Sequence, residues 1–205
     1  MSDEGPTSRR GFFRALTLAG LDRAEEAGER VGRLFKGDTA TPPPRRWLRP
    51  PGARPESEFL TTCESCGECV QACPAQCIRL DAQRAGGGPY IIARESPCVV
   101  CDDLACMPAC PTDALQLVDH VQQIDMGWAI VDHDRCLRTE PDGEDCRLCV
   151  EPCPEGEAAI GINPQGLVEV RDGCIGCGVC EHACPTEPAS IVVEPHHAGP
   201  SPERP

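Results

Sequence analysis

Cysteines that recur in four groups of four are the residues of this chain best suited to chemistry. The chain has 17 cysteines, and each group of four ends in Cys-Pro. Thiolate sulfur is the ligand of iron–sulfur clusters and of structural zinc, so the pattern predicts metal centres. The groups are unit one (Cys63, Cys66, Cys69, Cys73), unit two (Cys98, Cys101, Cys106, Cys110), unit three (Cys136, Cys146, Cys149, Cys153) and unit four (Cys174, Cys177, Cys180, Cys184).

The spacing of units one and four is more specific than the cysteine count. Both follow Cys-x₂-Cys-x₂-Cys-x₃-Cys-Pro, the run of bacterial ferredoxins that hold two 4Fe–4S clusters. Three cysteines are expected to curl around one cubane, while the fourth starts a short helix and reaches the partner cluster. The glycines Gly67, Gly176 and Gly178 would let the backbone approach the cluster closely. All sixteen cysteines of the units are therefore predicted iron ligands of four 4Fe–4S clusters.

Disulfides and zinc are the two rival interpretations of so many cysteines. A disulfide framework is favoured in secreted chains with an even cysteine count, whereas 17 is odd and neighbours two residues apart rarely bridge. Structural zinc sites use paired Cys-x₂-Cys knuckles without a third cysteine two residues on. Both rivals therefore fit the spacing less well than clusters do.

The seventeenth cysteine and the histidines fall outside the repeat. Cys77 aligns with Ala114 when the units are superposed on Cys-Pro, so it is predicted to be a small packing residue. His182 lies inside unit four, where the cysteine set is already complete, and is expected at the surface or beside the ligands. No catalytic triad, phosphate loop or dinucleotide fingerprint occurs. We therefore expect electron transfer, with no catalytic residues, rather than an enzyme with its own substrate site.

The composition supports a fold built on cofactors. Aromatic residues are 3% of the chain, against 22 prolines and 20 glycines, which leaves little apolar material for a core. Residues 60–205 hold 8 Arg, no Lys and 24 Asp and Glu, a net charge of −16. An acidic surface argues against nucleic acid. It fits the redox partners with basic docking surfaces that we expect, and it fits equally an acidity that only confers solubility. No stretch approaches 18 apolar residues, so no membrane span is expected.

Three segments are expected along the chain. Residues 1–58 form an arm with an amphipathic helix over 11–36 and a proline-rich linker, residues 59–193 form the four-unit body, and residues 194–205 form a loose tail. Apolar pieces between the units predict a β-hairpin in each link, with strands at 78–80 and 90–92, 114–118 and 128–131, and 159–162 and 167–170. The predicted fold class is α+β: two pseudo-symmetric lobes like bacterial ferredoxins, with short hairpins and helices around four cubanes, preceded by the amphipathic helix.

The N-terminal residues leave the compartment open. Ser8-Arg9-Arg10-Gly11-Phe12-Phe13 is similar to a twin-arginine export signal. The apolar stretch that should follow is only Ala15–Leu21, and charged residues interrupt it. We expect a cytoplasmic protein, with twin-arginine export to the periplasm as the alternative.

Several segments resemble the ferredoxin-type proteins that accompany periplasmic nitrate reductase and methylamine dehydrogenase, the NapF, NapG and MauM kind. They are Ser8–Gly11, Arg49–Pro51, Phe59–Thr61, Pro97–Asp103 and Met126–His133, together with the wide third cysteine loop. The resemblance implies several 4Fe–4S clusters that pass electrons to or from a partner redox system, here predicted to be of the nitrate-reductase type. Two alternatives remain open: a permanently bound wiring subunit of a molybdenum or tungsten oxidoreductase, and an assembly factor for such an enzyme.

The pairing of the units is open between a sequential arrangement, one with two and three with four, and a nested one. The two regular units stand at the ends, and four-cluster subunits of molybdenum enzymes, which look similar, are nested. We therefore favour nesting, in which Cys184 completes the set of unit one, Cys73 that of unit four, Cys153 that of unit two and Cys110 that of unit three. A Cys73 sulfur beside Cys98 and Cys101 would show the sequential arrangement instead.

Overall fold

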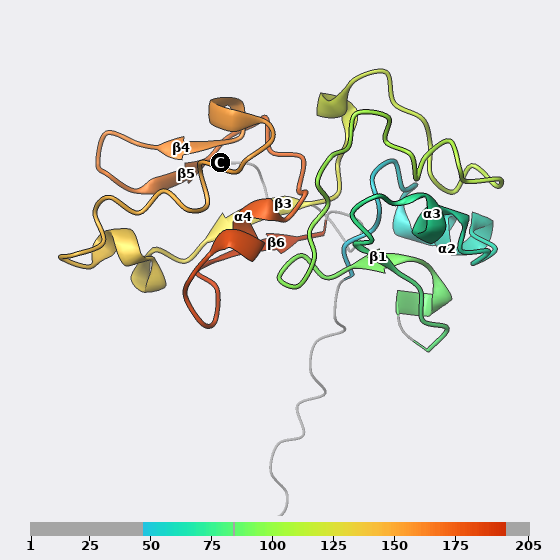
Figure 1. The fold of residues 1–205 in the computed structure, drawn as a ribbon, viewed down its shortest axis with the longest axis horizontal. Coiled ribbons are helices and arrows are strands. Elements are labelled where there is room, and N and C mark those ends of the chain that lie inside the picture. Colours follow the sequence, from blue (N-terminus) through green and yellow to red (C-terminus); the bar gives the residue numbers. More distant parts are fainter. Residues whose placement is uncertain (1–46, 84, 196–205) are drawn as a thin grey trace, which may run out of the picture. The chain divides into compact units, whose positions relative to one another are not determined.

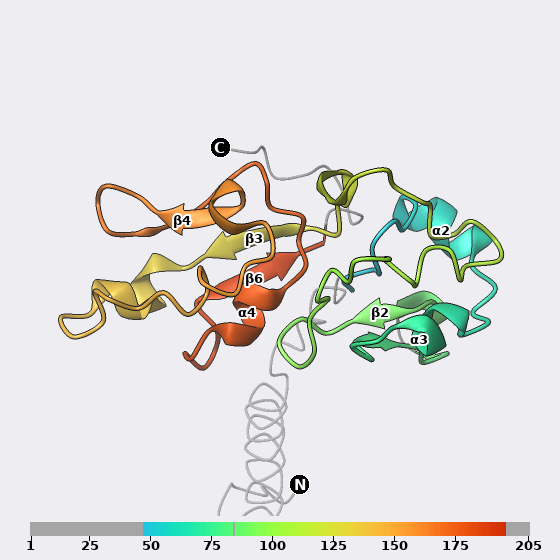
Figure 2. The same cartoon turned by 45° about the horizontal axis from the view of Figure 1, so that its top comes forward.

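Short helices and strands, joined by long turns, make up the described part of the chain. The computed structural model describes residues 47–83 and 85–195 (Figures 1 and 2). The amphipathic helix expected at 11–36, the arginine pair and most of the expected tail lie outside these residues. The helices are α2 (Glu56–Thr62), α3 (Glu68–Ala72) and α4 (Val179–Ala183), and the strands are β1 (Ile78–Arg79), β2 (Tyr90–Ile91), β3 (Trp128–Val131), β4 (Ile160–Ile162), β5 (Val168–Val170) and β6 (Ile191–Glu194). Single 3₁₀ turns occur at Ala85–Gly87, Val121–Gln123, His133–Arg135, Leu137–Thr139 and Gly156–Ala158.

This mixture of few helices and short strands is consistent with a ferredoxin-like domain. Within the described residues, no helix has the length and apolar character that a membrane crossing requires.

Two of the three expected hairpins are present. β1 pairs with β2, with Ile78 opposite Ile91, and β4 pairs with β5, with Ile160 opposite Val170; both pairs are antiparallel. These hairpins connect unit one to unit two and unit three to unit four.

The middle hairpin was predicted wrongly. β3 does not pair with the 114–118 segment but with β6, at the far end of the body, with Ala129 opposite Val193 (Figure 1). Leu115 forms an isolated antiparallel bridge with Ala53 instead. We call units one and two with their flanking segments the first half of the body, and units three and four with theirs the second half. Both halves have the same plan, because the segment before the first unit of a half pairs with the segment after its second unit. An apolar β-pattern indicates that a strand exists, but it does not identify the strand's partner.

The boundary between arm and body also needs correction. Residues 48–58 were expected in the arm, yet Leu48 and Arg49 are 4% and 0% exposed, and Leu48 bridges to Ile91. The Arg49 guanidinium donates from Nε to Glu56 Oε2 at 2.9 Å and from Nη1 to the carbonyl oxygen of Pro89 at 2.9 Å. It also lies 4.7 Å from the ring centroid of Phe59. A buried arginine needs such partners for its charge, so the segment before unit one is fixed to the core.

The interior consists of two clusters of buried residues in which cysteines are prominent. The first contains Phe59, Ile78, Ile91, Leu115 and Met126, together with cysteines of units one, two and four. The second contains Ala129, Val150, Ile160, Val168 and Ile191, together with cysteines of units three and four. Cysteine side chains thus make up a substantial part of both buried clusters.

Candidate functional site: four cysteine-lined cavities

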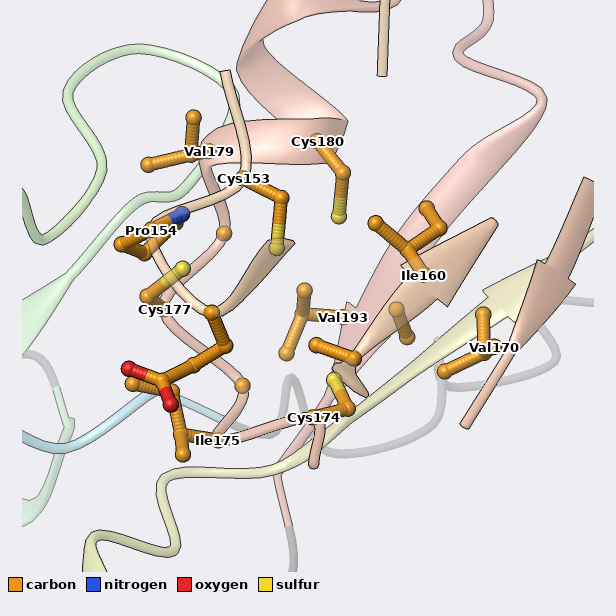
Figure 3. A pocket seen from close by; sticks show the side chains of 15 residues that line it. Cys153, Pro154, Ile160, Val170, Cys174, Ile175, Cys177, Val179, Cys180 and Val193 are labelled. Carbon is orange, nitrogen blue, oxygen red and sulfur yellow. The ribbon is translucent and has the colours of Figure 1, made fainter. Parts of the chain in front are cut away.

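The sixteen cysteines of the units line four cavities, four cysteines to each. We name each cavity after the unit that supplies three of its cysteines. They are site I (Cys63, Cys66, Cys69 and Cys110), site II (Cys98, Cys101, Cys106 and Cys73), site III (Cys136, Cys146, Cys149 and Cys184) and site IV (Cys174, Cys177, Cys180 and Cys153). Figure 3 shows site IV, where the sulfurs of all four cysteines point into one space walled by Ile160, Ile175 and Val193.

The nested pairing is wrong. Cys73 lies with Cys98 and Cys101, and Cys110 lies with unit one. In the same way, Cys153 of unit three lies with the cysteines of unit four, and Cys184 of unit four lies with those of unit three. The four fourth cysteines therefore follow the sequential arrangement. This arrangement agrees with the hairpins β1·β2 and β4·β5, because each returns the chain so that consecutive units face one another.

The two regular units deliver their cysteines through a left-handed residue and a very short helix. Gly67 and Gly178 have φ of 82° and 87° and directly precede α3 and α4. The third cysteine lies in the helix, whereas the fourth, Cys73 or Cys184, is the extended residue that ends it. The expectation that the fourth cysteine starts the helix is thus corrected. A five-residue helix that ends on an extended residue directs two cysteines of one unit into two different cavities.

Hydrogen-bond donors lie close to the sulfurs of the fourth cysteines of units two and four. Cys110 Sγ accepts the backbone N–H of Leu115 at 3.5 Å and lies 3.7 Å from the Thr112 hydroxyl. Cys184 Sγ accepts the backbone N–H of Ser190 at 3.4 Å and lies 3.2 Å from the Thr186 hydroxyl and 3.3 Å from that of Ser190. Such bonds stabilise a thiolate and tune the potential of a cluster it binds.

Burial changes the acidity of the cysteines. Burial, with further contributions from neighbouring cysteines, raises the pKa of Cys69 and of Cys106 to about 12, and burial raises that of Cys149 to about 11. Burial acts in the same direction on Cys184, but the hydroxyls of Ser190 and Thr186 outweigh it and lower its pKa to about 7. The thiols of the first three are therefore protonated at neutral pH unless a metal centre replaces their protons.

The donor sets fit a four-iron cluster better than a single ion. Within the described ranges, no three His, Cys, Asp or Glu side chains are placed so as to hold one metal ion. All 17 cysteines lie in those ranges and all are free of disulfides. Each set supplies the four sulfur ligands that a 4Fe–4S cubane takes, and the wall of site IV is largely apolar.

Cys77 is buried at 2% exposure in the first core cluster, in agreement with a packing role. Its surroundings show more than packing, however, because it lines site II as a fifth cysteine. Its sulfur lies 3.6 Å from Cys73 Sγ. Interaction with the Cys98 thiol raises the pKa of Cys77, and the same interaction lowers the pKa of Cys98 to about 7.

Sequence analysis missed several residues around the cavities. Thr112 and Thr186 share the signal Cys-Pro-Thr in units two and four, which could have been recognised. Ser190 and Arg94 carried no such signal. His182 is exposed, as expected, and its Nδ1 lies 2.9 Å from the carbonyl oxygen of Arg94.

Each of the four cavities takes three cysteines from one unit and the fourth cysteine of the neighbouring unit. This exchange of cysteines defines an iron–sulfur protein of the ferredoxin type. The family described as a 4Fe-4S dicluster domain matches residues 62–114, which span units one and two, the units that share sites I and II. The chain is 40% identical over 165 residues to the methylamine utilization ferredoxin-type protein MauM of Methylorubrum extorquens, covering 74% of each chain. It is 38% identical over 164 residues to the ferredoxin-type protein NapG of Escherichia coli, covering 72% of this chain and 70% of NapG. With the ferredoxin-type protein NapF of the same organism it shares 30% identity over 154 residues, 74% of this chain and 87% of NapF. The chain belongs to this family of 4Fe–4S ferredoxin-type electron-transfer proteins.

Proposed function

We propose that the protein binds four 4Fe–4S clusters, one in each of sites I–IV, and carries electrons to or from a partner oxidoreductase of the nitrate-reductase type. The observation that carries the proposal is the division of sixteen cysteines into four sets, each with three from one unit and one from the next. This is the ligand exchange of two-cluster ferredoxins, present twice in one chain. The body then consists of two ferredoxin-like halves, and the protein is a carrier without its own substrate site.

Bound clusters would supply one-electron redox chemistry, and the residues of the chain would bind them and control their surroundings. The sixteen cysteines would hold the iron. Aliphatic side chains such as Ile160, Ile175 and Val193 exclude water from site IV, while backbone N–H groups and hydroxyls set the charge balance at the sulfurs.

The loop of unit one is the proposed contact for a basic redox partner. Cys66 is exposed, whereas Cys177, which holds the same place in unit four, is buried. The residues around Cys66 include the exposed Glu64 and Glu68, while unit four has Ile175 and Val179 at those places. The same loop is thus charged where it meets solvent and apolar where it is covered, so site I is an outer end of the cofactor series.

Counting the cofactors tests the proposal. Anaerobically purified protein is expected to contain about 16 iron and about 16 acid-labile sulfide per chain, four of each for every cubane. Stoichiometric zinc with little sulfide would overturn it. Co-purification with an oxidoreductase, and its reduction by the reduced protein, would identify the partner. We further propose that the protein works in the cytoplasm, which cell fractionation tests directly.

A further inference from the structure

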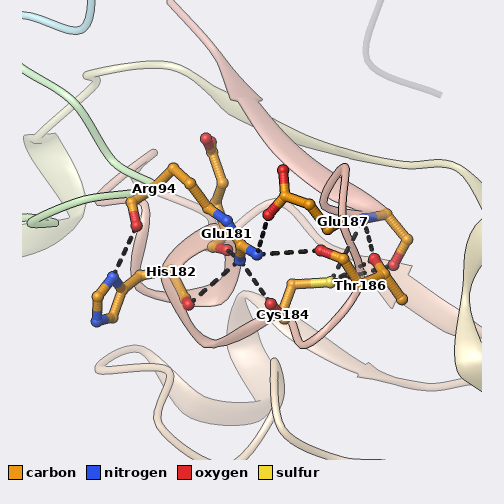
Figure 4. A network of polar contacts seen from close by, with 7 residues as sticks. Arg94, Glu181, His182, Cys184, Thr186 and Glu187 are labelled. Carbon is orange, nitrogen blue, oxygen red and sulfur yellow. Dashed lines mark hydrogen bonds and ion pairs between the residues drawn. The ribbon is translucent and has the colours of Figure 1, made fainter.

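Arg94 connects the two halves of the body through its guanidinium group. The residue follows β2 and leads into unit two, but its partners lie at the end of α4 (Figure 4). Nη1 donates to the carbonyl oxygens of Glu181 at 2.8 Å, Cys184 at 2.5 Å and His182 at 3.4 Å. Nη2 donates to the carbonyl oxygen of Thr186 at 3.0 Å and to Glu187 Oε2 at 3.2 Å. In return, the His182 ring nitrogen Nδ1 lies 2.9 Å from the carbonyl oxygen of Arg94.

Close backbone contacts continue this connection toward the cavities. A Cβ atom on Gly178 would lie 2.4 Å from the Cβ of Ala93, so only glycine permits the approach. Four residues beyond Arg94, the backbone N–H of Cys98 donates to the carbonyl oxygen of Cys177 at 3.0 Å. Cys98 lines site II and Cys177 lines site IV, so one hydrogen bond joins cysteines of two sites in different halves of the body. We call sites II and IV the inner sites.

We propose that electrons pass between the two halves at this Cys98–Cys177 contact, and that Arg94 is the positioning residue that holds the contact closed. The proposal rests on the proposed function, because it requires clusters in sites II and IV. With clusters bound in sites II and IV, one electron would pass from the reduced cluster to the oxidised one, and no bond or proton would change place. The order of the sites is then I, II, IV, III, with sites I and III at the outer ends.

The chemistry of arginine suits this task. The guanidinium of Arg94 donates to the carbonyl oxygens of Glu181 and His182 at the C-terminal end of α4, where the negative end of the helix dipoles lies. It also donates to the carbonyl oxygens of Cys184 and Thr186, which follow the helix. A planar guanidinium presents five N–H donors in a fixed fork and can satisfy several of them together, which a lysine ammonium on its flexible stem cannot. Because electron transfer slows steeply with distance, a small separation of the two halves would act on the inner sites first.

Spectroscopy of the loaded protein tests the proposal, with Arg54 as a matched control. Arg54 is 29% exposed against 31% for Arg94, and its Nε also donates to a carbonyl oxygen, that of Asp113 at 2.7 Å, but within the first half. Holoprotein with Arg94→Ala, Arg94→Lys or Arg54→Ala is prepared anaerobically. Iron and sulfide are counted, electron paramagnetic resonance spectra of the fully reduced proteins are compared, and amide hydrogen exchange is followed over residues 93–98 and 177–187.

For Arg94→Ala we expect full iron content, loss of the part of the spin–spin interaction that arises between the inner sites, and faster exchange of the Cys98 amide. Arg54→Ala should keep the wild-type spectrum. If Arg94→Ala does not retain its clusters, Arg94→Lys is the variant that tests the inference. For it we expect full iron content with a weakened spin–spin interaction between the inner sites. A wild-type spectrum and wild-type Cys98 exchange in an iron-replete Arg94 variant would overturn the inference and leave the proposed function standing. Wild-type protein without iron and sulfide would instead overturn the proposed function itself.

Discussion

Removing the Ser190 hydroxyl should lower the reduction potential of one cluster, the one that we propose for site III. Ser190 is 4% exposed, and its hydroxyl lies 3.3 Å from Cys184 Sγ. When Cys184 is bound to iron as a thiolate, the hydroxyl is the donor. Its bond stabilises the reduced cluster more than the oxidised one, because the reduced cluster is the more negative. Ser190→Ala removes this donor and keeps the backbone N–H that also reaches Cys184 Sγ.

The size of the shift follows from the strength of one hydrogen bond. A single intramolecular hydrogen bond contributes about 0.5–1.5 kcal/mol. For a one-electron couple about 1.4 kcal/mol corresponds to about 59 mV, so the expected fall is about 20–60 mV. Thr112→Val is the matched control, because the Thr112 hydroxyl lies 3.7 Å from Cys110 Sγ, beyond a strong contact.

A redox titration followed by electron paramagnetic resonance measures the potentials of the individual clusters. We expect one potential to fall in Ser190→Ala while the others remain, and a smaller shift in Thr112→Val. Iron content must equal that of the wild type, so that a lost cluster is not mistaken for a shifted one. An unchanged or raised potential in iron-replete Ser190→Ala would refute the assignment of the hydroxyl as a donor to a cluster ligand.

Three further predictions follow from the cavities. Removal of the clusters should unfold the body, since cysteines and their cofactors replace aromatic core residues; circular dichroism and proteolysis check this, and a compact, cooperative apoprotein would contradict it. Cys77→Ala should leave iron content unchanged while Cys73→Ala reduces it, and equal losses in an iron assay would show that Cys77 is a ligand. Glu64→Lys with Glu68→Lys should slow electron transfer to cytochrome c, used as a basic acceptor protein, and weaken its dependence on ionic strength. The same double charge change at the exposed Glu157 and Asp172 is the control, and an equal effect there would refute a specific docking loop.

The positions of the cysteines within each unit could be predicted from the sequence because ligand spacing is a local property. Cys63, Cys66 and Cys69 lie within seven residues, so any chain that closes a loop there brings the three together. The strands of the hairpins β1·β2 and β4·β5 were local as well, and they formed from apolar runs that lie close together in the sequence. Cys77 could be placed in the core for the same reason, since its position follows directly from the repeat.

Contacts between distant segments could not be predicted in this way. Arg94 has no helical or strand pattern around it, and its partners are about 90 residues further along the chain. Arg49 appeared to belong to a proline-rich linker, because a charged residue beside prolines is usually exposed. Only the folded chain shows that Glu56, Phe59 and the carbonyl of Pro89 surround its side chain.

The error in cluster pairing has a definite cause in strand topology. Nesting would require units two and three to face each other, and hence a hairpin between the 114–118 segment and β3. The structure instead joins Leu115 to Ala53 and β3 to β6, so each outer strand closes on its own half. In the structure, the fourth cysteine of unit two lies with the loop of unit one, and that of unit four lies with the loop of unit three. The sequential arrangement thus accompanies two hairpins, β1·β2 and β4·β5, together with the pairing of β3 with β6, and cysteine spacing carries no information about the partner of β3.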